Sequence, residues 1–308
     1  SNISSCANRT ADAGNRSVFS LEARKALTKE GIFSAPAKIN LCLHVLGRRA
    51  DGYHELRMVM QQINLCDRIR ILVGAGDGVT VGCSGVDLAE GTENIAARAA
   101  RLILREAGVR AVVDIEIDKK IPVAAGLGGG SSDAAAVLKA VNGMLALGFD
   151  DFALAKMGLS LGADVPFFIR GGAALAEGIG ERLRPFSIRP DVGYLLVNPG
   201  FAVSTAWVYR NLVLTSKGDE ANLARFVGCY SGLLRLLHND LEKVTLTYYP
   251  VLKDIKKRLL KAGADGALMS GSGPTVFGLF RDRAAARRAG EELARTTSWQ
   301  VFPAEPCS

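Results

Sequence analysis

A glycine-rich stretch over residues 119–136 constrains the fold of this chain more than any other segment. Its sequence is Lys-Lys-Ile-Pro-Val-Ala-Ala-Gly-Leu-Gly-Gly-Gly-Ser-Ser-Asp-Ala-Ala-Ala. The four glycines are Gly126, Gly128, Gly129 and Gly130. Glycine permits positive φ angles and a close approach to a ligand, and Ser131 or Ser132 can cap a following helix. The stretch therefore predicts an anion cradle, in which backbone N–H groups and a helix dipole face a phosphate chain.

The stretch matches neither of the two commonest phosphate-binding loops. The P-loop requires Lys directly after its last glycine, and the dinucleotide fingerprint requires glycine where this chain has Ser131. Residues 113–117 alternate apolar and acidic side chains, which is typical of a half-solvated antiparallel strand. Apolar residues recur at helical spacing over residues 137–145. We expect a strand, a phosphate loop and a helix; a glycine-rich turn without a ligand is the alternative.

Length and composition predict a two-domain globular protein. The chain has 308 residues, more than most single cores hold, and 48% of them are hydrophobic. The net charge of +7 suits an acidic substrate such as a nucleotide, although a solvated basic surface would give the same value. No basic tract is interleaved with aromatic residues, which argues against a nucleic-acid partner. No apolar run approaches the ~18 residues of a membrane span, so we expect no membrane partner.

The cysteines and histidines predict neither a disulfide framework nor a metal centre. The six cysteines include no C-x-x-C pair, and the three histidines do not cluster in the sequence. Scattered thiols favour a cytoplasmic location, with the bacterial cytosol expected first. Residues 1–30 lack a signal-peptide core and are expected to be an extension outside the fold. They are rich in Ser, Ala and Arg, so a disordered segment, a cloning remnant and a plastid transit peptide remain open.

The first half of the ordered chain begins with a strictly alternating strand over residues 37–45. Period-two alternation predicts that one face carries Ile39, Leu41, Leu43 and Val45 and the other Lys38, Asn40, Cys42 and His44. Asp51-Gly52 then predicts a tight turn. Tyr53 and His54 follow this turn, where they could stack on a planar base and hydrogen-bond to its edge. A tyrosine packed on the hairpin beside a surface histidine is the alternative.

Further strands and helices complete a first domain over residues 31–190. We expect strands near residues 58–65, 68–73 and 79–83, and helices over 95–107, capped by Thr92, and over 151–161. Asp164 then stands alone before an apolar segment, where a charge is costly unless it is paired or used. Capping or turning of the chain is the alternative role for this carboxylate. These elements predict an α+β layer arrangement.

Residues 191–308 predict a second α+β domain. A buried strand over 194–197 opens it, and a helix is expected from residue 204. Helical spacing returns over residues 233–237, 251–260 and 283–295. A small-residue loop, 270–273, lies between two strand-like runs, and a short strand over 299–302 ends the pattern.

Three segments together resemble the GHMP kinase superfamily of small-molecule, ATP-dependent kinases. These segments are residues 36–41 (Pro-Ala-Lys-Ile-Asn-Leu), 122–134 and 269–275 (Met-Ser-Gly-Ser-Gly-Pro-Thr). The resemblance extends over residues 34–302. It implies a two-domain α+β fold, with an N-terminal domain like ribosomal protein S5 domain 2 and a ferredoxin-like C-terminal domain. The site is then expected in the cleft between them.

Two further segments narrow the resemblance within the superfamily. Residues 48–56 (Arg-Arg-Ala-Asp-Gly-Tyr-His-Glu-Leu) and 161–166 (Leu-Gly-Ala-Asp-Val-Pro) resemble members that act on a cytidylated alcohol. They imply transfer of the ATP γ-phosphate to the 2-hydroxyl of 4-diphosphocytidyl-2-C-methyl-D-erythritol, in non-mevalonate isoprenoid biosynthesis. A mevalonate or homoserine kinase, a non-catalytic nucleotide-binding protein and an RNA-binding protein on the S5-like layer are the alternatives.

The resemblance also implies roles for residues at the acceptor end of the site. Asp164 is the expected general base, and Lys38 is its charge partner. Such a lysine keeps the carboxylate ionised and neutralises developing charge. The residues expected to bind the substrate are Asn40, Tyr53, His54 and Thr205.

By the same resemblance, the glycine stretch and its neighbours bind ATP. The expected ATP-binding residues are Asn94, Lys119, Pro122, Val123, Ala124, Ala125, Gly126, Leu127, Gly128, Gly129, Gly130, Ser131 and Ser132. Mg²⁺ is expected to be held by phosphates and water, with help from Ser131 or Ser132 and without a dedicated protein metal site. The loop of residues 270–275 is expected to support the phosphates from the second domain. The expected partners are ATP and the cytidylated alcohol, and monomer and homodimer both remain open.

Overall fold

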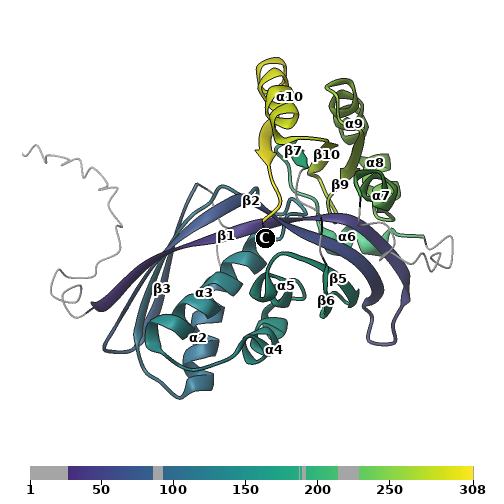
Figure 1. Cartoon of the computed structure of the whole chain (residues 1–308). Coiled ribbons are helices and arrows are strands. Elements are labelled where there is room, and N and C mark those ends of the chain that lie inside the picture. Colours follow the sequence, from purple (N-terminus) through teal and green to yellow (C-terminus); the bar gives the residue numbers. More distant parts are fainter. Residues whose placement is uncertain (1–26, 86–92, 187, 189–191, 214–228, 308) are drawn as a thin grey trace, which may run out of the picture.

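The protein consists of two stacked β-sheets with helices on their outer faces (Figure 1). The computed structural model describes residues 27–85, 93–186, 188, 192–213 and 229–307. The strands of the larger, seven-stranded sheet are β1 (Leu27–Arg48), β2 (His54–Gly74), β3 (Gly78–Ser84), β4 (Val112–Asp118), β5 (Ala173–Gly178), β6 (Arg182–Phe186) and β8 (His238–Asn239). Its order is β3-β4-β2-β1-β8, with β5 paired to β2 and β6 paired to β5.

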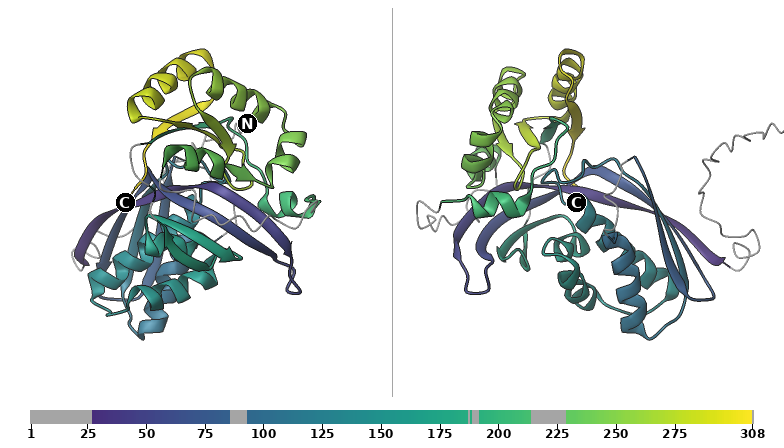
Figure 2. Two further views of the ribbon diagram at one scale, coloured as in Figure 1. Left: turned by 45° about the vertical axis from the view of Figure 1, so that its right-hand side comes forward. Right: turned by 180° about the vertical axis from the view of Figure 1, so that it is seen from behind.

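Four helices cover one face of this sheet. They are α2 (Ile95–Ala107), α3 (Gly129–Leu145), α4 (Asp151–Leu161) and α5 (Val165–Arg170). Figure 1 shows them below the sheet, and both views of Figure 2 show the second layer on the opposite side. The larger sheet is therefore covered on both faces over its central strands.

The second layer is a four-stranded sheet with order β11-β7-β10-β9. Its strands are β7 (Gly193–Asn198), β9 (Gly266–Met269), β10 (Val276–Phe280) and β11 (Gln300–Ala304). The helices of this part of the chain are α6 (Thr205–Arg210), α7 (Tyr230–Leu236), α8 (Glu242–Tyr248), α9 (Val251–Lys261) and α10 (Arg283–Thr296). Helices α9 and α10 lie on the outer side of this sheet (Figure 1). The α+β arrangement expected from the sequence is confirmed.

Two segments from the second half of the chain also hydrogen-bond to the long strands of the first sheet. Strand β8 pairs in parallel with β1, and Pro306 forms an antiparallel bridge with Ile63 of β2. The Cys307 N–H donates to the Gln62 carbonyl at 2.8 Å. The two sheets are thus joined by backbone hydrogen bonds as well as by packing.

A β-bulge in β1 corrects the strict alternation expected for residues 37–45. Asn40 pairs with Met60 but Cys42 pairs with Val59, so Leu41 is an extra residue on this strand. One extra residue reverses the faces of all the residues that follow. Lys38, Asn40 and Leu43 therefore line one cavity, whereas Cys42 packs in the cluster that contains Ile39 and Leu41. The predicted row of four polar side chains on a single face is wrong beyond Asn40.

Other predicted elements differ in their ends. Strand β1 begins at Leu27, four residues before the expected start of order at Gly31. The segments 58–65 and 68–73 belong to a single strand, β2, because β1 runs beside both of them. Thr92, the expected cap of α2, lies outside the described residues, and the Asn94 side chain accepts the Ala96 N–H at 2.8 Å. Helix α8 was not predicted from the sequence, because it is rich in β-branched and aromatic residues, which have low helix propensity.

The start of α3 also differs from the sequence prediction. Its N-cap is Gly128, in the left-handed conformation with φ 73°, and no side chain caps the helix there. Ser131 and Ser132 lie one turn further along, inside the helix. Within the described residues, no helix has both the length and the apolar character that crossing a bilayer would require.

The two sheets pack on each other through an apolar cluster. Ile39 and Val59 of the larger sheet share it with Tyr194, Leu196 and Phe277 of the smaller one, and all five are fully buried. The rings of Tyr194 and Phe277 meet edge to face, with centroids 6.0 Å apart. This cluster fixes the small sheet on the large one and so sets the distance between the loops at their edges.

Removing one ring from this cluster should destabilise the whole protein. We expect Phe277→Ala to lower the free energy of unfolding by about 3–5 kcal/mol, because a fully buried phenyl group leaves a cavity. Phe152→Ala is the matched control, since that ring is 79% exposed, and it should change stability by no more than ~0.5 kcal/mol. Urea denaturation of the two variants measures both values. Equal effects would show that the cluster does not hold the sheets together.

Candidate active site

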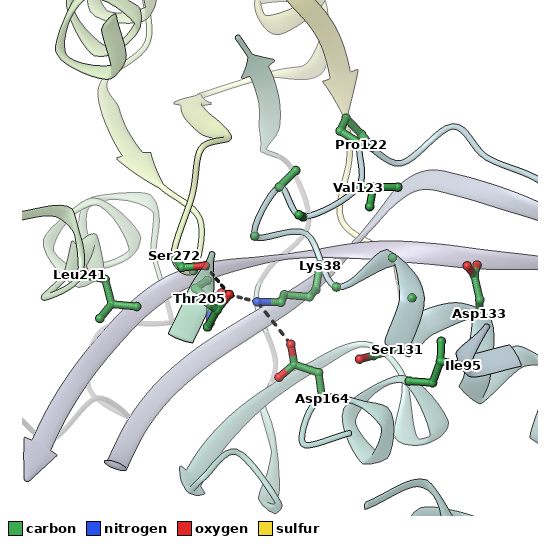
Figure 3. A pocket seen from close by; sticks show the side chains of 18 of the residues that line it. Lys38, Ile95, Pro122, Val123, Ser131, Asp133, Asp164, Thr205, Leu241 and Ser272 are labelled. Carbon is green, nitrogen blue, oxygen red and sulfur yellow. Dashed lines mark hydrogen bonds and ion pairs between the residues drawn. The ribbon is translucent and has the colours of Figure 1, made fainter. Parts of the chain in front are cut away.

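A cavity of about 660 Å³ lies between the glycine loop, β1 and the second layer (Figure 3). Its wall has two parts. The part beside the starts of α2 and α3 includes Asn94, Ile95, Arg98, Lys119, Pro122, Val123, Ala124, Ala125, Gly126, Gly128, Gly129, Gly130 and Ser131. The other part includes Lys38, Asn40, Leu43, Leu56, Met58, Asp164, Ile179, Thr205, Tyr209, Leu241 and Ser272. The fold thus brings most of the predicted site residues to one cavity.

The glycine loop is pressed against the loop of residues 270–273. A Cβ atom on Gly126, whose φ is 78°, would lie only 2.1 Å from the Ser270 carbonyl oxygen. The Ser270 hydroxyl donates to the Gly126 carbonyl at 3.0 Å and accepts the Asn40 N–H at 3.2 Å. Glycine is therefore required at position 126 to let the second layer meet the loop.

The loop leads directly into α3, and its geometry fits a phosphate chain. Gly128, Gly129 and Gly130 line the cavity at the point where the helix begins. The first N–H groups of a helix have no partners within it, and the helix dipole places partial positive charge there. A Cβ atom on Gly128 would approach the Phe168 ring to 2.9 Å, so glycine is also needed for packing. These features make the loop suitable for binding an anion.

Lys38 and Asp164 face each other across the cavity (Figure 3). The Lys38 Nζ lies 3.6 Å from the Asp164 carboxylate and donates to the Asn40 Oδ1 at 2.5 Å. The Lys38 side chain is 6% exposed and that of Asp164 is 28% exposed. Asp164 holds the N-cap position of α5, yet its carboxylate makes no capping hydrogen bond. The carboxylate points to the lysine instead, which argues against the capping alternative.

The Lys38 backbone connects this pair to the glycine loop. Its N–H donates to the Leu127 carbonyl at 2.9 Å. The Leu127 side chain is buried and does not line the cavity, so Leu127 contacts Lys38 through its backbone carbonyl. Ser132 also lies outside the lining; its hydroxyl is buried and has no hydrogen-bond partner among the described residues. The neighbouring Ser131 lines the cavity.

The end of the cavity beyond Asp164 contains a tyrosine that the sequence analysis did not select. Tyr209 lines the cavity, and burial together with the charge of Asp164 raises the pKa of its phenol. The His54 ring stacks on it, with centroids 4.9 Å apart. Burial and the nearby Arg48 lower the pKa of His54, which favours the uncharged ring. Tyr53, which is 61% exposed, lies outside the cavity lining.

The predicted substrate contact Thr205 lies at the start of α6. Its hydroxyl is 2.7 Å from that of Ser272 in the loop of residues 270–273. Both residues line the cavity. The hydrogen bond therefore joins α6 to this loop at the cavity wall.

Lys119 lines the cavity wall, but its ammonium group is held between two buried carboxylates. Its Nζ donates to the Asp67 Oδ2 at 2.5 Å and to the Asp133 Oδ2 at 2.8 Å. The second Asp67 oxygen accepts the N–H groups of Lys120 and Ile121 at 2.6 and 2.8 Å. Asp67 thus anchors the chain entering the glycine loop, while Lys119 joins it to α3.

Neither carboxylate was selected from the sequence. Asp67 follows Cys66 in a strand, where a single acidic residue is usually a solvated side chain, but here it is fully buried. Asp133 lies near the start of α3, where an acidic residue is common and does not by itself indicate a buried ion pair. Burial raises the pKa of Asp133 to about 7, and Lys119 opposes this shift while Asp67 adds to it. Asp67 and Lys119 are 52 positions apart, so no local pattern in the sequence indicates that they form a buried pair.

Comparison with known proteins assigns the chain to a family. Residues 94–172 match the GHMP kinases N terminal domain, and residues 220–297 match GHMP kinases C terminal. A 4-diphosphocytidyl-2-C-methyl-D-erythritol kinase of Syntrophotalea carbinolica is 55% identical, over 89% of this chain and 98% of that relative. The kinase of the same name from Pelobacter propionicus is 53% identical, over 88% of this chain and 97% of that relative.

Solved structures agree. A crystal structure of 4-(cytidine 5'-diphospho)-2C-methyl-D-erythritol kinase superposes with a TM-score of 0.79 and 37% identity, over 90% of this chain and all of that one. A homoserine kinase from Cytophaga hutchinsonii, at 20% identity and a TM-score of 0.70 over 94% and 96% of the two chains, shares the fold. The chain therefore belongs to the 4-diphosphocytidyl-2-C-methyl-D-erythritol kinases of the GHMP kinase superfamily.

Proposed function

We propose that this protein transfers the γ-phosphate of ATP to the 2-hydroxyl of 4-diphosphocytidyl-2-C-methyl-D-erythritol, giving the 2-phosphate and ADP. The observation that carries this proposal is the Lys38–Asp164 pair beside a glycine loop that opens into a helix N-terminus. The names of the family members supply the acceptor alcohol. The reaction belongs to non-mevalonate isoprenoid biosynthesis.

Asp164 acts as the general base in this proposal. Its carboxylate accepts the proton of the acceptor hydroxyl while that oxygen attacks the γ-phosphorus. The bond from the γ-phosphorus to its bridging oxygen breaks, and ADP leaves. Lys38, 3.6 Å from the carboxylate, pairs with Asp164 and neutralises charge that develops on the transferred group. Phosphoryl transfer requires mainly such positioning and neutralisation.

ATP is the cosubstrate, and the glycine loop is the proposed site of its phosphates. We propose that the residues predicted from the sequence to bind ATP do so. Leu127 contributes through its backbone contact with Lys38. Mg²⁺ is proposed to accompany the phosphates and to neutralise their charge, as this ion usually does with several waters retained. Ser131 is the hydroxyl that fits this role, because it lines the cavity while Ser132 is buried.

The cytosine is proposed to bind at the end of the cavity beyond Asp164. Tyr209 lines the cavity there, and the His54 ring stacks on it from outside the lining; the uncharged ring of His54, favoured by its lowered pKa, can both donate and accept a hydrogen bond. Tyr53 is proposed to cover the base from its exposed position after the tight turn. Asn40 and Thr205 are proposed to position the alcohol. The cavity then lies between an N-terminal domain over residues 31–190 and a C-terminal domain over residues 191–308.

Release of ADP from Mg-ATP tests the reaction and its acceptor. We expect release with the cytidylated alcohol, and only background release with mevalonate, homoserine or no acceptor. Turnover of mevalonate or homoserine instead would reject the proposed base-binding site while keeping the kinase chemistry. Binding of ATP without any turnover would favour the non-catalytic alternative.

Replacement of the proposed base should abolish most of the activity. We expect Asp164→Asn to lower kcat by about 10²–10⁴, the usual contribution of a general base. The fold should be retained, because this carboxylate is partly exposed and caps no helix. Asp254→Asn is the control: its side chain is 65% exposed on α9, and its kcat should equal that of the unmodified protein. A kcat for Asp164→Asn within tenfold of that value would contradict the role.

Asp67 is proposed as a positioning residue for the glycine loop. We expect Asp67→Asn to lower kcat/KM for ATP by about 10- to 100-fold, since hydrogen bonds to a charged group contribute roughly 1.5–3 kcal/mol each. The KM for the alcohol should change much less, which separates this role from general destabilisation. Asp77→Asn, which removes an exposed ion pair with Arg110, is the matched control and should change neither constant. Equal losses for both substrates would show that Asp67 serves only stability.

A further inference from the structure

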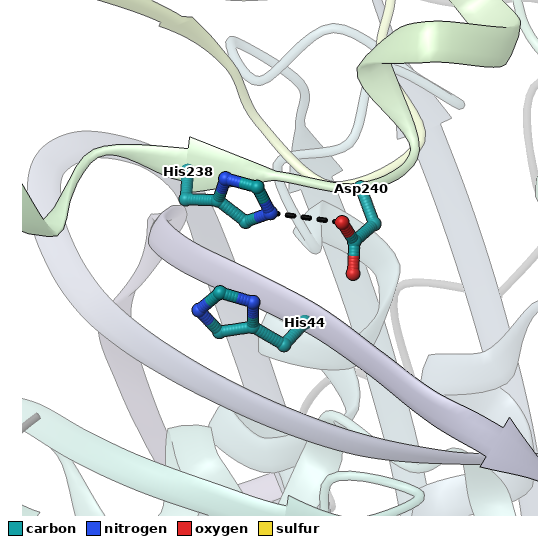
Figure 4. A group of neighbouring side chains, drawn as sticks. All are labelled: His44, His238 and Asp240. Atoms are coloured by element: carbon teal, nitrogen blue, oxygen red, sulfur yellow. Dashed lines mark hydrogen bonds and ion pairs between the residues drawn. The ribbon is translucent and has the colours of Figure 1, made fainter. Parts of the chain in front are cut away.

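Two histidines that are distant in the sequence meet with an aspartate outside the cavity (Figure 4). His44 lies on β1 and His238 on β8, and their rings stack with centroids 4.4 Å apart. The His238 Nε2 lies 2.8 Å from the Asp240 Oδ1. One ligand atom from each of the three side chains lies within 4.8 Å of the others. Two of the three histidines, which are scattered in the sequence, therefore meet in the folded chain.

The backbone around the cluster fixes its carboxylate in place. The Asp240 Oδ2 accepts the Val45 N–H at 2.8 Å, which leaves the Oδ1 directed to His238. The Asp240 N–H donates to the Leu43 carbonyl at 3.0 Å, so the residue is tied to β1 at two points. A carboxylate held by an outer hydrogen bond is the usual arrangement of a metal ligand.

The chemistry of the three side chains favours a transition metal. Imidazole nitrogens suit Zn²⁺, Ni²⁺ and Cu²⁺, whereas Mg²⁺ and Ca²⁺ prefer sites made of oxygen ligands. Two histidines, one carboxylate and a water complete a tetrahedral zinc site. The rings lie only 18° from parallel, so they must tilt for both lone pairs to converge on one ion. The side chain of His238 is 45% exposed, which gives its ring room to turn and gives water access.

We propose that His44, His238 and Asp240 bind one Zn²⁺-like transition-metal ion, with water as a further ligand. The ion would join β1 of the larger sheet to the segment entering α8. Asn239, between the two ligands, donates to the Met269 and Gly271 carbonyls at 2.8 Å each. Metal binding therefore stabilises the connection that supports the loop of residues 270–273. The site is separate from the proposed phosphate site and requires no ATP.

Titration with Co²⁺ tests this site without nucleotide or substrate. We expect the chelator-treated protein to bind one equivalent, with the visible d–d absorption of a tetrahedral Co²⁺ ion, and Zn²⁺ to displace it. His44→Ala and His238→Ala should each weaken binding by more than the roughly 10- to 100-fold typical of losing an outer-shell partner. His54→Ala removes the remaining histidine of the chain and should bind Co²⁺ normally. Thermal unfolding without metal checks that each variant folds.

The same experiment gives clear contrary outcomes. Binding that survives both His44→Ala and His238→Ala would overturn the proposal, as would the absence of tetrahedral absorption. A sulfur-to-cobalt charge-transfer band would assign the ion to cysteine thiols instead. Zn²⁺ should also raise the melting temperature of the unmodified protein and leave that of His238→Ala unchanged, since a ligand that binds only the native state stabilises it. An equal rise in both would also reject the site.

Discussion

The contact between Gly126 and Ser270 is the constraint on which the rest of the site depends. It brings two loops from different sheets so close that no side chain fits between them. The same Ser270 hydroxyl contacts β1 through the Asn40 N–H, so three segments meet at one serine. The small sheet must therefore be seated correctly for the glycine loop to take this shape. The geometry of the site therefore depends directly on how the two sheets pack.

Charge in this site is arranged by burial as much as by contact. Lys38 and Lys119 are almost equally buried, but they have different partners. Lys119 is enclosed by two carboxylates, and these ion pairs hold the chain that enters the glycine loop in place. Lys38 meets a neutral amide and one more distant carboxylate, so its charge remains directed at the cavity. Two equally buried lysines thus have different surroundings, because Lys119 is enclosed by carboxylates and Lys38 is not.

The local signals in the sequence predicted much of the fold, and the structure brings most of the predicted site residues to one cavity, while their roles stay a prediction. The glycine loop, the acidic alternation of β4 and the cap of α6 depend on neighbouring residues, so the sequence alone indicates them. The family resemblance added the pairing of Lys38 with Asp164, and the structure brings the two side chains to one cavity.

What could not be predicted depends on strand register and on long-range contacts. The stack of His54 on Tyr209 joins the start of β2 to α6, and the partners of Lys119 come from β2 and α3. The bulge at Leu41 follows from how β1 meets β2 and leaves no pattern in β1 itself. Propensity and periodicity describe each segment alone, so such pairs become visible only in the folded chain.

The extra residue in β1 lets one strand serve two purposes. Before Leu41, the polar positions face the cavity and supply Lys38 and Asn40. After it, the opposite positions face the cavity, and His44 is turned to the other side, where it meets His238. A relative that lacked this one residue would keep every other side chain of the segment. Without the bulge, however, the residues after it would point to the opposite face of the sheet. In comparisons within the family, the length of this strand therefore carries as much information as the identity of its residues.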